Sequence, residues 1–305
     1  MIYDLIIVGA GAAGLYAGAQ LAIEKKEAKN KTDTLKRILI IDQSNECGKK
    51  LLLTGAGQCN LTNNEDIKNF INRYGENGKK IRSLLYAHNN IDVMNFFEKI
   101  GFEVFAREDG KVFPKTLDAH EVRDVLVKTI VENGIEIAVN TKLISIKALE
   151  NNEGFVLQTE KNRQSEFKTR LLLLAPGAAS YPKTGSDGSI YPMLIKLGLE
   201  IIEPKPALVP LFVKDYLYKS LSGISVEDVI VKKGEGKKAI KKRASLLFTH
   251  DAFSGPAILH ISRFVEKGDE ICIDYLPEIS EEVLLSIIQN EIKGNAKQIA
   301  SFFAQ

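Results

Sequence analysis

Residues 2–23, IYDLIIVGAGAAGLYAGAQLAI, decide the fold of this chain. Ile2 to Val8 is a short, largely β-branched apolar run, which is typical of a parallel strand buried on both faces. Gly9, Gly11 and Gly14 follow in a GxGxxG pattern, and an alanine-rich helical stretch continues to Ile23. Such a turn lets the backbone approach a pyrophosphate and points a helix N-terminus at its oxygens. The order of strand, turn and helix therefore favours dinucleotide binding over a purely structural turn.

A dinucleotide-binding unit also has an acidic residue at the end of its second strand, where a carboxylate accepts hydrogen bonds from ribose hydroxyls. Asp42 closes the apolar run from Arg37 to Ile41 and fits this position. It lies 28 residues after Gly14, whereas about 20 are usual. The lysine-rich stretch 24–36 explains the excess as a solvated insertion. A surface carboxylate at a strand end is the alternative interpretation of Asp42.

Residues 48–63, GKKLLLTGAGQCNLTN, form a second glycine-rich segment. It combines adjacent lysines, a Thr-Gly-x-Gly turn and a cluster of short hydrogen-bonding side chains. Glycines let the backbone pass close to a flat ligand, and amide N–H groups can polarise the electron-rich pyrimidine edge of a flavin. The alternative is a cluster of turn and capping residues, because Thr and Asn favour such positions in any protein.

The composition limits the class of protein and its partners. At about 150 residues per domain, the length suggests two domains. The 41 Lys and Arg and 39 Asp and Glu give a net charge of +2, so we expect neither nucleic acid nor membrane as a partner. The three cysteines form no CxxC pair, which excludes a secreted disulfide framework. No apolar run approaches the roughly 20 residues of a spanning helix, and no export signal is visible, so we expect a cytoplasmic protein.

The rest of the chain changes pattern at about residue 204. Before it, helices are expected at 91–100 and 119–131, each followed by a capping glycine, with two short strands between residues 102 and 113. Strand patterns then predict a strand, a meander and a returning buried strand at 135–139, 143–146, 155–159 and 167–175. Beyond residue 204, strand-like runs without intervening helices predict an antiparallel module at 208–213, 226–231, 245–249 and 270–274. Residues 281–303 have the pattern of an amphipathic packing helix.

Six motifs, in order along the chain, resemble those of the HI0933-like flavoproteins, also described as BaiN-like or aminoacetone-oxidase-like NAD(P)/FAD-dependent oxidoreductases. The family pattern is GxGxAG, GxKxLxTGxGRCNxTN, Gly-Arg/Lys-Val-Phe-Pro, LATGGxSYPxxGSTGDGY, PALVPL and LLFTHxGxSGPAxL. The matching segments are residues 9–14, 48–63, 110–115, 174–191, 206–211 and 246–259. The resemblance implies an α/β fold, with a glutathione-reductase-type Rossmann domain for FAD at residues 1–190 and an inserted antiparallel β-rich substrate domain at 191–305. It also implies that backbone near residues 142–145 meets the adenine, where a hairpin without a ligand is the alternative.

The chain departs from the family pattern in three places. Gln58 replaces the arginine of the second glycine segment, which removes a fixed charge near the flavin edge. Pro176 and Ala178 replace Thr and Gly, and this puts backbone contacts there in question, because proline lacks an N–H and alanine resists positive φ. Family members also continue into a segment with Gly-Glu-x-x-Asp and Gly-Gly-Tyr-Asn motifs that complete the FAD site. The sequence ends at Gln305 without them, so the resemblance implies a member truncated at the C-terminus.

Few side chains are obvious candidates for chemistry. The four histidines are scattered without metal-ligand spacing, and we predict no metal site. Cys59 lies within the second glycine-rich segment, but without a second cysteine nearby a packing thiol is the favoured interpretation. His250 and Tyr181 are candidate proton donors, and for each a structural role is the alternative. The basic run 232–243 is interpreted as a solvated hairpin tip, with RNA binding as the weaker alternative.

These observations predict an FAD-dependent oxidoreductase that transfers hydride between a small organic substrate, an enone or an amine, and flavin, with NAD(P)H or oxygen as the redox partner. The alternative is a truncated, FAD-deficient member that acts as a non-enzymatic fragment or interaction module. No catalytic residue is assigned beyond the three candidates His250, Tyr181 and Cys59. The predicted cofactor-binding residues are Gly9, Ala10, Gly11, Ala12, Gly14, Asp42, Lys49, Lys50, Thr54, Gly55, Gly57, Cys59, Asn60, Ala175 and Gly177.

Overall fold

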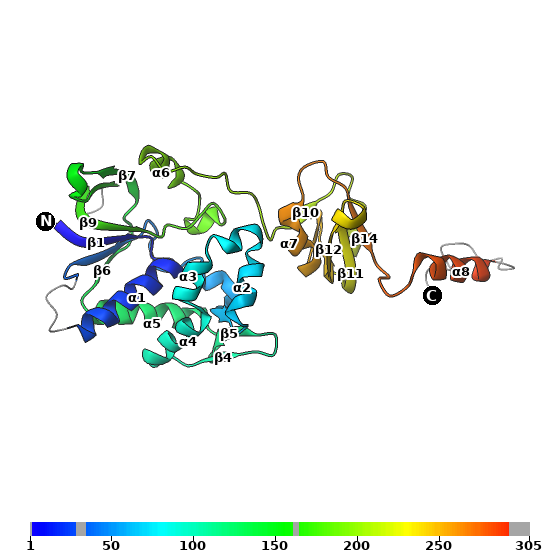
Figure 1. Cartoon of the computed structure of the whole chain (residues 1–305), viewed down its shortest axis with the longest axis horizontal. Coiled ribbons are helices and arrows are strands. Elements are labelled where there is room, and N and C mark those ends of the chain that lie inside the picture. Colours follow the sequence, from blue (N-terminus) through cyan, green and yellow to red (C-terminus); the bar gives the residue numbers. More distant parts are fainter. Residues whose placement is uncertain (1, 29–34, 161–164, 293–305) are drawn as a thin grey trace. The chain divides into compact units, whose positions relative to one another are not determined.

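The computed structural model of the chain describes residues 2–28, 35–160 and 165–292 (Figure 1). The chain divides into two compact units, Met1–Ile202 and Glu203–Gln305. The boundary predicted from the sequence, between residues 190 and 191, falls earlier, directly before helix α6 (Tyr191–Lys196). The last predicted helix, 281–303, is helical as α8 (Glu281–Ile292), and its remaining residues lie outside the described part.

The first unit is built on a six-stranded sheet with the order β6-β2-β1-β9-β8-β7. The strands are β1 (Ile2–Val8), β2 (Ile38–Ile41), β6 (Glu136–Ala138), β7 (Leu143–Ala148), β8 (Phe155–Thr159) and β9 (Glu166–Leu174). The four strands β6, β2, β1 and β9 are parallel, and β8 and β7 continue the sheet antiparallel. This arrangement confirms the predicted Rossmann-type sheet with its meander and returning strand.

Strand β1 is buried on both faces of this sheet. Leu5 and Ile7 belong to a core beneath helices α1 (Ala12–Glu27) and α5 (Ala119–Glu132), which lie side by side (Figure 1). Ile6 and Val8 belong to a second core on the opposite face. This alternation explains why the strand is an unbroken apolar run after Asp4.

Short elements connect β2 to α5. They are a 3₁₀ segment at Leu51–Gly57, β3 (Thr62–Asn63), α2 (Ile67–Arg73), a 3₁₀ turn at Gly75–Lys79, α3 (Arg82–Ala87), α4 (Asn90–Lys99), β4 (Val104–Ala106) and β5 (Lys111–Pro114). The last two strands and β3 form a small antiparallel sheet. The hairpin and α4 confirm the sequence prediction, whereas α2 and α3 were not predicted.

The second unit has a five-stranded antiparallel sheet with the order β10-β13-β12-β11-β14. Its strands are β10 (Leu211–Phe212), β11 (Ser225–Lys233), β12 (Ile240–Phe248), β13 (Ala252–Ser254) and β14 (Ile271–Asp274). A short helix, α7 (Pro256–Ile261), buries Ala257, Ile258 and Ile261 in the core of this unit. The antiparallel module was predicted, but the three-residue strand β13 and the six-residue helix α7 are too short to give a periodic pattern.

The described residues hold neither a candidate membrane span nor a candidate metal cluster. None of their helices combines the length and apolar character that crossing a bilayer requires. Within the same part of the chain, no three His, Cys, Asp or Glu side chains gather where they could hold a metal ion.

Candidate functional site

The parallel strands β1, β2 and β9 end together, with Val8 in register with both Ile41 and Leu174. The first glycine turn leaves the sheet at this edge. Gly9 donates its N–H to the carbonyl of Ile41 and has a φ of +103°. A Cβ on Gly9 would lie 2.3 Å from the carbonyl oxygen of Ala175. Glycine is therefore required at this position by both conformation and space.

Helix α1 begins directly after this turn and packs on it. A Cβ on Gly14 would lie 1.8 Å from the Gly9 carbonyl oxygen, so only glycine allows the helix to lie this close to the strand end. Around Gly11, in contrast, an added Cβ would meet nothing within 4 Å. Gly11 is the N-cap of α1 and provides no side-chain cap. The first turn of the helix therefore leaves N–H groups open to an anion.

Asp42, the first residue after β2, holds the glycine turn. One carboxylate oxygen accepts the backbone N–H of Ala10 at 2.6 Å, and the other accepts the N–H of Ser44 at 2.7 Å. A carboxylate has about four acceptor positions, so two of them are left for other donors such as ribose hydroxyls. The position predicted for the acidic residue is thus occupied by a carboxylate directly beside the turn.

A cavity of about 510 Å³ lies at this sheet edge, wholly within the first unit. Ten of the predicted cofactor-binding residues line it: Gly9, Ala10, Gly11, Ala12, Asp42, Lys49, Lys50, Thr54, Ala175 and Gly177. Leu143, within the predicted adenine segment 142–145, also lines the cavity, as does the neighbouring Thr141. Sequence segments that lie far apart in the chain are therefore gathered around one space.

One wall of the cavity was missed by the sequence prediction. It is the loop from Thr184 to Ile190, followed by Met193. Gln43 donates its side-chain N–H to the Gly185 carbonyl at 2.8 Å, which ties this loop to the end of β2. Ser189, through its hydroxyl and its backbone N–H, holds the pKa of Asp187 below its usual range. The signal for this wall was the turn sequence Gly-Ser-Asp-Gly at 185–188, within a motif that was already recognised.

Lys50 brings a positive charge to the same cavity. Its Nζ lies 3.2 Å from Ser180 Oγ, and a Cβ on Gly177 would lie 3.8 Å from that Nζ. No ion pair of Lys50 occurs within the described ranges of the chain. A cation in the wall of a cavity that an open helix N-terminus also lines suits an anionic ligand.

The other predicted cofactor-binding residues do not line the cavity. Gly14 lies behind the turn, where it packs the helix. Gly55, Gly57, Cys59 and Asn60 belong to a tight loop with left-handed backbone at residues 55, 56, 57 and 59. We refer to residues 54–60 as the second glycine loop.

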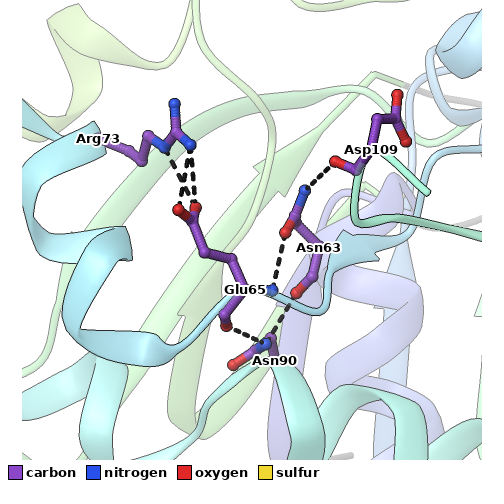
Figure 2. Close-up of polar contacts among 5 residues, drawn as sticks. All are labelled: Asn63, Glu65, Arg73, Asn90 and Asp109. Carbon is purple, nitrogen blue, oxygen red and sulfur yellow. Dashed lines mark hydrogen bonds and ion pairs between the residues drawn. The ribbon is translucent and has the colours of Figure 1, made fainter. Parts of the chain in front are cut away.

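Side chains from distant segments support the chain just after this loop (Figure 2). Asn90 is buried at the start of α4 and donates to the carbonyls of Asn63 and Glu65 at 2.8 and 3.0 Å. Asn63 accepts the Glu65 N–H at 2.8 Å, and Arg73 pairs with the Glu65 carboxylate at 3.1 Å. The Asn-rich end of the motif therefore acts mainly as a structural anchor.

The three candidate catalytic residues lie apart. Cys59 is 3% exposed in the first core, and burial raises the pKa of its thiol, partly opposed by a hydrogen bond with Thr54. Tyr181 is 56% exposed, and its backbone bridges to Ser186. His250 is an exposed residue of the second unit, in the turn between β12 and β13. None of the three lines the cavity.

The sheet edge, the open helix N-terminus and the Asp42 carboxylate define a Rossmann-type nucleotide-binding domain. The profile described as the HI0933-like protein Rossmann domain matches residues 3–248, and that of the HI0933-like protein barrel and H2TH domain matches residues 205–305. The chain belongs to the HI0933-like family, as its motifs predicted. This membership supports FAD as the cofactor and oxidoreduction as the class of chemistry.

Three curated relatives share most of this chain. A Haemophilus influenzae protein named ribosomal RNA dihydrouridine synthase is 30% identical over 91% of this chain and 66% of its own length. The Escherichia coli K12 protein of the same name is 27% identical over 94% and 67%. A Clostridium scindens 3-dehydro-bile acid delta(4,6)-reductase is 26% identical over 90% and 64%. The chain thus spans about two thirds of the length of these relatives.

Among solved structures, the open form of a flavocytochrome c3 fumarate reductase is 16% identical and matches with a TM-score of 0.46, covering 74% of this chain and 47% of that one. THI4 of Thermovibrio ammonificans, also 16% identical, matches with a TM-score of 0.39 over 65% and 64%.

Proposed function

We propose that this protein is an FAD-dependent reductase of carbon–carbon double bonds conjugated with a carbonyl group. The observation that carries the proposal is the cavity at the ends of β1, β2 and β9, with an open helix N-terminus, Asp42 and Lys50 in its walls. When bound, FAD would take a hydride from NAD(P)H and deliver it to the substrate, and the protein supplies position and electrostatics.

The residues present fit the two polar parts of a dinucleotide. The uncapped first turn of α1 and the Lys50 ammonium would bind the pyrophosphate, and the open space at Gly11 lets its oxygens come close. The free acceptor positions of Asp42 would take ribose hydroxyls. The loop at residues 184–190 would exclude water from one side of the bound nucleotide.

The name of one relative supports the conjugated-bond class over the amine class. A 3-dehydro-bile acid delta(4,6)-reductase is named for reducing C=C bonds of a substrate that carries a keto group at position 3. Such a reduction adds a hydride to the β-carbon and a proton to the α-carbon. Because Tyr181 does not line the cavity, we assign the proton to solvent.

Anaerobic half-reactions test this proposal. The chain loaded with FAD is reduced with NADPH or NADH and then mixed with a conjugated steroid dienone, or with its saturated ketone as the matched control. We expect the flavin to be reoxidised by the dienone alone. Reduction of the flavin by aminoacetone, with reoxidation by oxygen but not by the dienone, would favour an amine oxidase instead. A chain that cannot be loaded with FAD would favour the non-enzymatic alternative.

RNA is a second candidate substrate, favoured by one feature of the second unit. Lys232 and Lys241 lie directly opposite each other on the antiparallel strands β11 and β12. Like charges at such positions are destabilising, and neither lysine has an ion pair among the residues that the structure describes. A phosphate backbone would neutralise both charges.

Binding of a uridine-containing single-stranded RNA, followed by anisotropy over a range of salt, tests this candidate. Neutralising both lysines, in K232S/K241S, should lower the slope of log K against log salt by up to about 2. Binding that is absent or insensitive to salt would contradict RNA as the substrate and leave a small molecule, as predicted from the composition.

We also propose the cytoplasm as the site of action. Cys47, Cys59 and Cys272 are all unpaired thiols, and free thiols are typical of reducing compartments.

A further inference from the structure

The second unit contains a cluster of five aromatic rings. Phe248, the last residue of β12, lies opposite Phe253 of β13 in the sheet, with ring centres 5.6 Å apart. Tyr216 packs edge-on against Phe253 at 5.3 Å, and Tyr218 lies 5.4 Å from the same ring. Tyr275, directly after β14, stacks on Phe248 with 6.4 Å between the ring centres. We refer to these five residues as the tyrosine cluster.

One polar atom of the tyrosine cluster lacks a partner. The hydroxyl of Tyr216 is buried and has no hydrogen-bond partner among the residues that the structure describes. Burial raises the pKa of Tyr216, and the Thr249 backbone, which opposes this rise, donates its N–H to the Ala252 carbonyl instead. A buried hydroxyl without a partner destabilises a folded chain, so its presence in the fold calls for an explanation.

The tyrosine cluster reaches the surface of the second unit. Tyr218, whose ring centre lies 5.6 Å from that of Tyr216, is 41% exposed, and Tyr275 is 39% exposed. Their neighbours in the chain, Leu217 and Leu276, are exposed as well. Exposed apolar side chains and aromatic rings therefore accompany a hydroxyl with unused hydrogen-bonding capacity. This combination suits a flat apolar ligand that carries an acceptor.

The electrostatics of the cluster favour an uncharged ligand over an anion. Burial raises the pKa of Tyr275, and Tyr218 and Tyr216 raise it further. The carboxylate of Asp251 adds to the rise in the pKa of Tyr216. Tyr216 and Tyr275 are therefore protonated at neutral pH and can act as O–H donors. The Asp251 carboxylate would repel an anion, whereas a carbonyl oxygen needs only a donor.

We propose that the tyrosine cluster binds a flat, uncharged ring compound whose carbonyl oxygen accepts a hydrogen bond from the Tyr216 hydroxyl. The identification of this ligand with the substrate of the reductase rests on the proposed function. A hydrogen bond to the carbonyl of an enone draws electron density away from the conjugated double bond. The contact that binds the ligand therefore also makes its β-carbon a better hydride acceptor.

The test compares wild type with two tyrosine-to-phenylalanine variants, without reductant, so that no turnover occurs. Y216F removes the unpartnered hydroxyl and keeps the ring. Y16F is the matched control, because the Tyr16 hydroxyl, in the first unit, is hydrogen-bonded to both Gln20 and His88 at 2.9 Å. A conjugated steroid dienone is titrated into each purified protein in the presence of oxidised FAD. Difference absorbance follows binding, since a hydrogen bond to the carbonyl shifts the dienone band to longer wavelength, and urea unfolding measures stability.

For Y216F we expect dienone binding about tenfold weaker than in wild type, without the shift to longer wavelength. Its urea midpoint should equal or exceed that of wild type, because the lost hydroxyl has no partner in the described fold. Y16F should show the reverse, with wild-type dienone binding and a lower urea midpoint, because it loses two hydrogen bonds. The two measurements together distinguish a ligand-binding hydroxyl from a structural one.

Wild-type dienone affinity and band position in Y216F would overturn this inference. A Y216F chain that unfolds at lower urea than wild type, or does not fold, would overturn it as well, because the hydroxyl would then have a structural partner. If the dienone still reoxidises the reduced flavin in either case, the proposed function stands. Dienone binding as expected, without reoxidation of the flavin, would leave this inference intact and overturn the proposed function. A wild-type chain with neither measurable dienone binding nor reoxidation would overturn both.

Discussion

The two glycine-rich loops of the first unit, residues 9–14 and 54–60, differ in why their backbone adopts its conformation. In the turn at residues 9–14, two glycines are forced by close contacts with backbone, at Ala175 and within the turn itself, and the third faces open space. In the second glycine loop, two of the left-handed positions are not glycine at all, because Ala56 and Cys59 have φ values of 55° and 59°. The first turn is held by its own glycines and by Asp42, directly after β2, whereas Gln58 of the second loop is held from the distant β4–β5 hairpin, by Arg107.

This difference explains what the sequence could predict. The GxGxxG turn has the usual glycine spacing and Asp42 closes the second strand, and the cavity forms at the strand ends where these two features lie. The second glycine loop was predicted to be part of the cofactor site, yet of its residues only Thr54 lines the cavity. Gln58 in this loop accepts a hydrogen bond from Arg107, 49 residues further along the chain, and Asn90 holds the carbonyls of Asn63 and Glu65 just after the loop.

The largest expected effect is on stability, and it should differ between a closely packed glycine of the first turn, Gly14, and an open one, Gly11. Gly14→Ala places a Cβ 1.8 Å from a backbone oxygen, and we expect the free energy of unfolding to fall by about 3 kcal/mol or more. Gly11→Ala is the matched control for folding, because its Cβ meets nothing within 4 Å, and its cost should be about 1 kcal/mol or less.

Gly11→Ala, which should fold almost as stably as wild type, is the variant that we expect to lose affinity for FAD. The Cβ of Gly11→Ala would occupy the space proposed for the pyrophosphate, so a folded variant should bind FAD at least about tenfold more weakly. Urea unfolding and a fluorescence titration with FAD measure the two quantities. A Gly14→Ala variant as stable as wild type would contradict the packing of α1, and unchanged FAD affinity in Gly11→Ala would contradict the pyrophosphate position.

The cysteines give the next largest contrast. Burial raises the pKa of Cys59 and of Cys47, whereas Cys272 is exposed. A raised pKa leaves less thiolate at a given pH, and only the thiolate attacks an alkylating reagent. At pH 7.5 we therefore expect iodoacetamide to label Cys272 first and Cys59 last. The labelling rates of these two should differ by about a hundredfold, because the reagent reaches the buried Cys59 only after local opening of the chain.

Mass spectrometry of peptides after timed labelling measures these rates. Because the pKa values of Cys47 and Cys59 are raised, their labelling rates should go on increasing at pH values where the labelling rate of an ordinary thiol no longer changes. Fast labelling of Cys59 in the folded chain would contradict its place in the core and revive it as a reactive candidate.

A smaller effect tests the support of the chain just after the second glycine loop. Asn90→Leu removes two hydrogen bonds and leaves the carbonyls of Asn63 and Glu65 without this buried donor, so we expect a loss of about 2 kcal/mol in unfolding free energy. Asn95→Leu, an exposed site on the same helix α4, is the control and should change stability by less than about 0.5 kcal/mol. Equal stability of the two variants in urea would show that Asn90 is no anchor.

The smallest expected effect comes from replacing alanine by glycine at two places, one in the second glycine loop and one in helix α1, which follows the first turn. Ala56→Gly relieves a left-handed alanine in the second glycine loop and should raise the unfolding free energy by up to about 1 kcal/mol. Ala17→Gly, inside α1, should lower it by about 1 kcal/mol. Opposite signs in the same urea assay would sharpen the contrast between the two loops, and equal signs would remove it.

Other parts of the fold show where local patterns suffice. Gly101 and Gly134 follow α4 and α5 with φ values of 76° and 73°, as their capping positions predicted. The loop at residues 184–190 shows the opposite case, because nothing local says that Gln43 will hold Gly185 beside the end of β2. Contacts of this kind, between segments far apart in the chain, decided which motif residues reached the cavity.

The most direct test of the account is the flavin content of the purified chain. Titration with FAD, followed by visible absorbance after removal of free ligand, should give one bound FAD per chain, with a spectrum shifted from that of free FAD. Asp42→Ala should weaken this binding at least about tenfold, because it removes both the turn's anchor and the ribose acceptor. A colourless chain that gains no bound flavin absorbance with added FAD would contradict the assignment of the cavity.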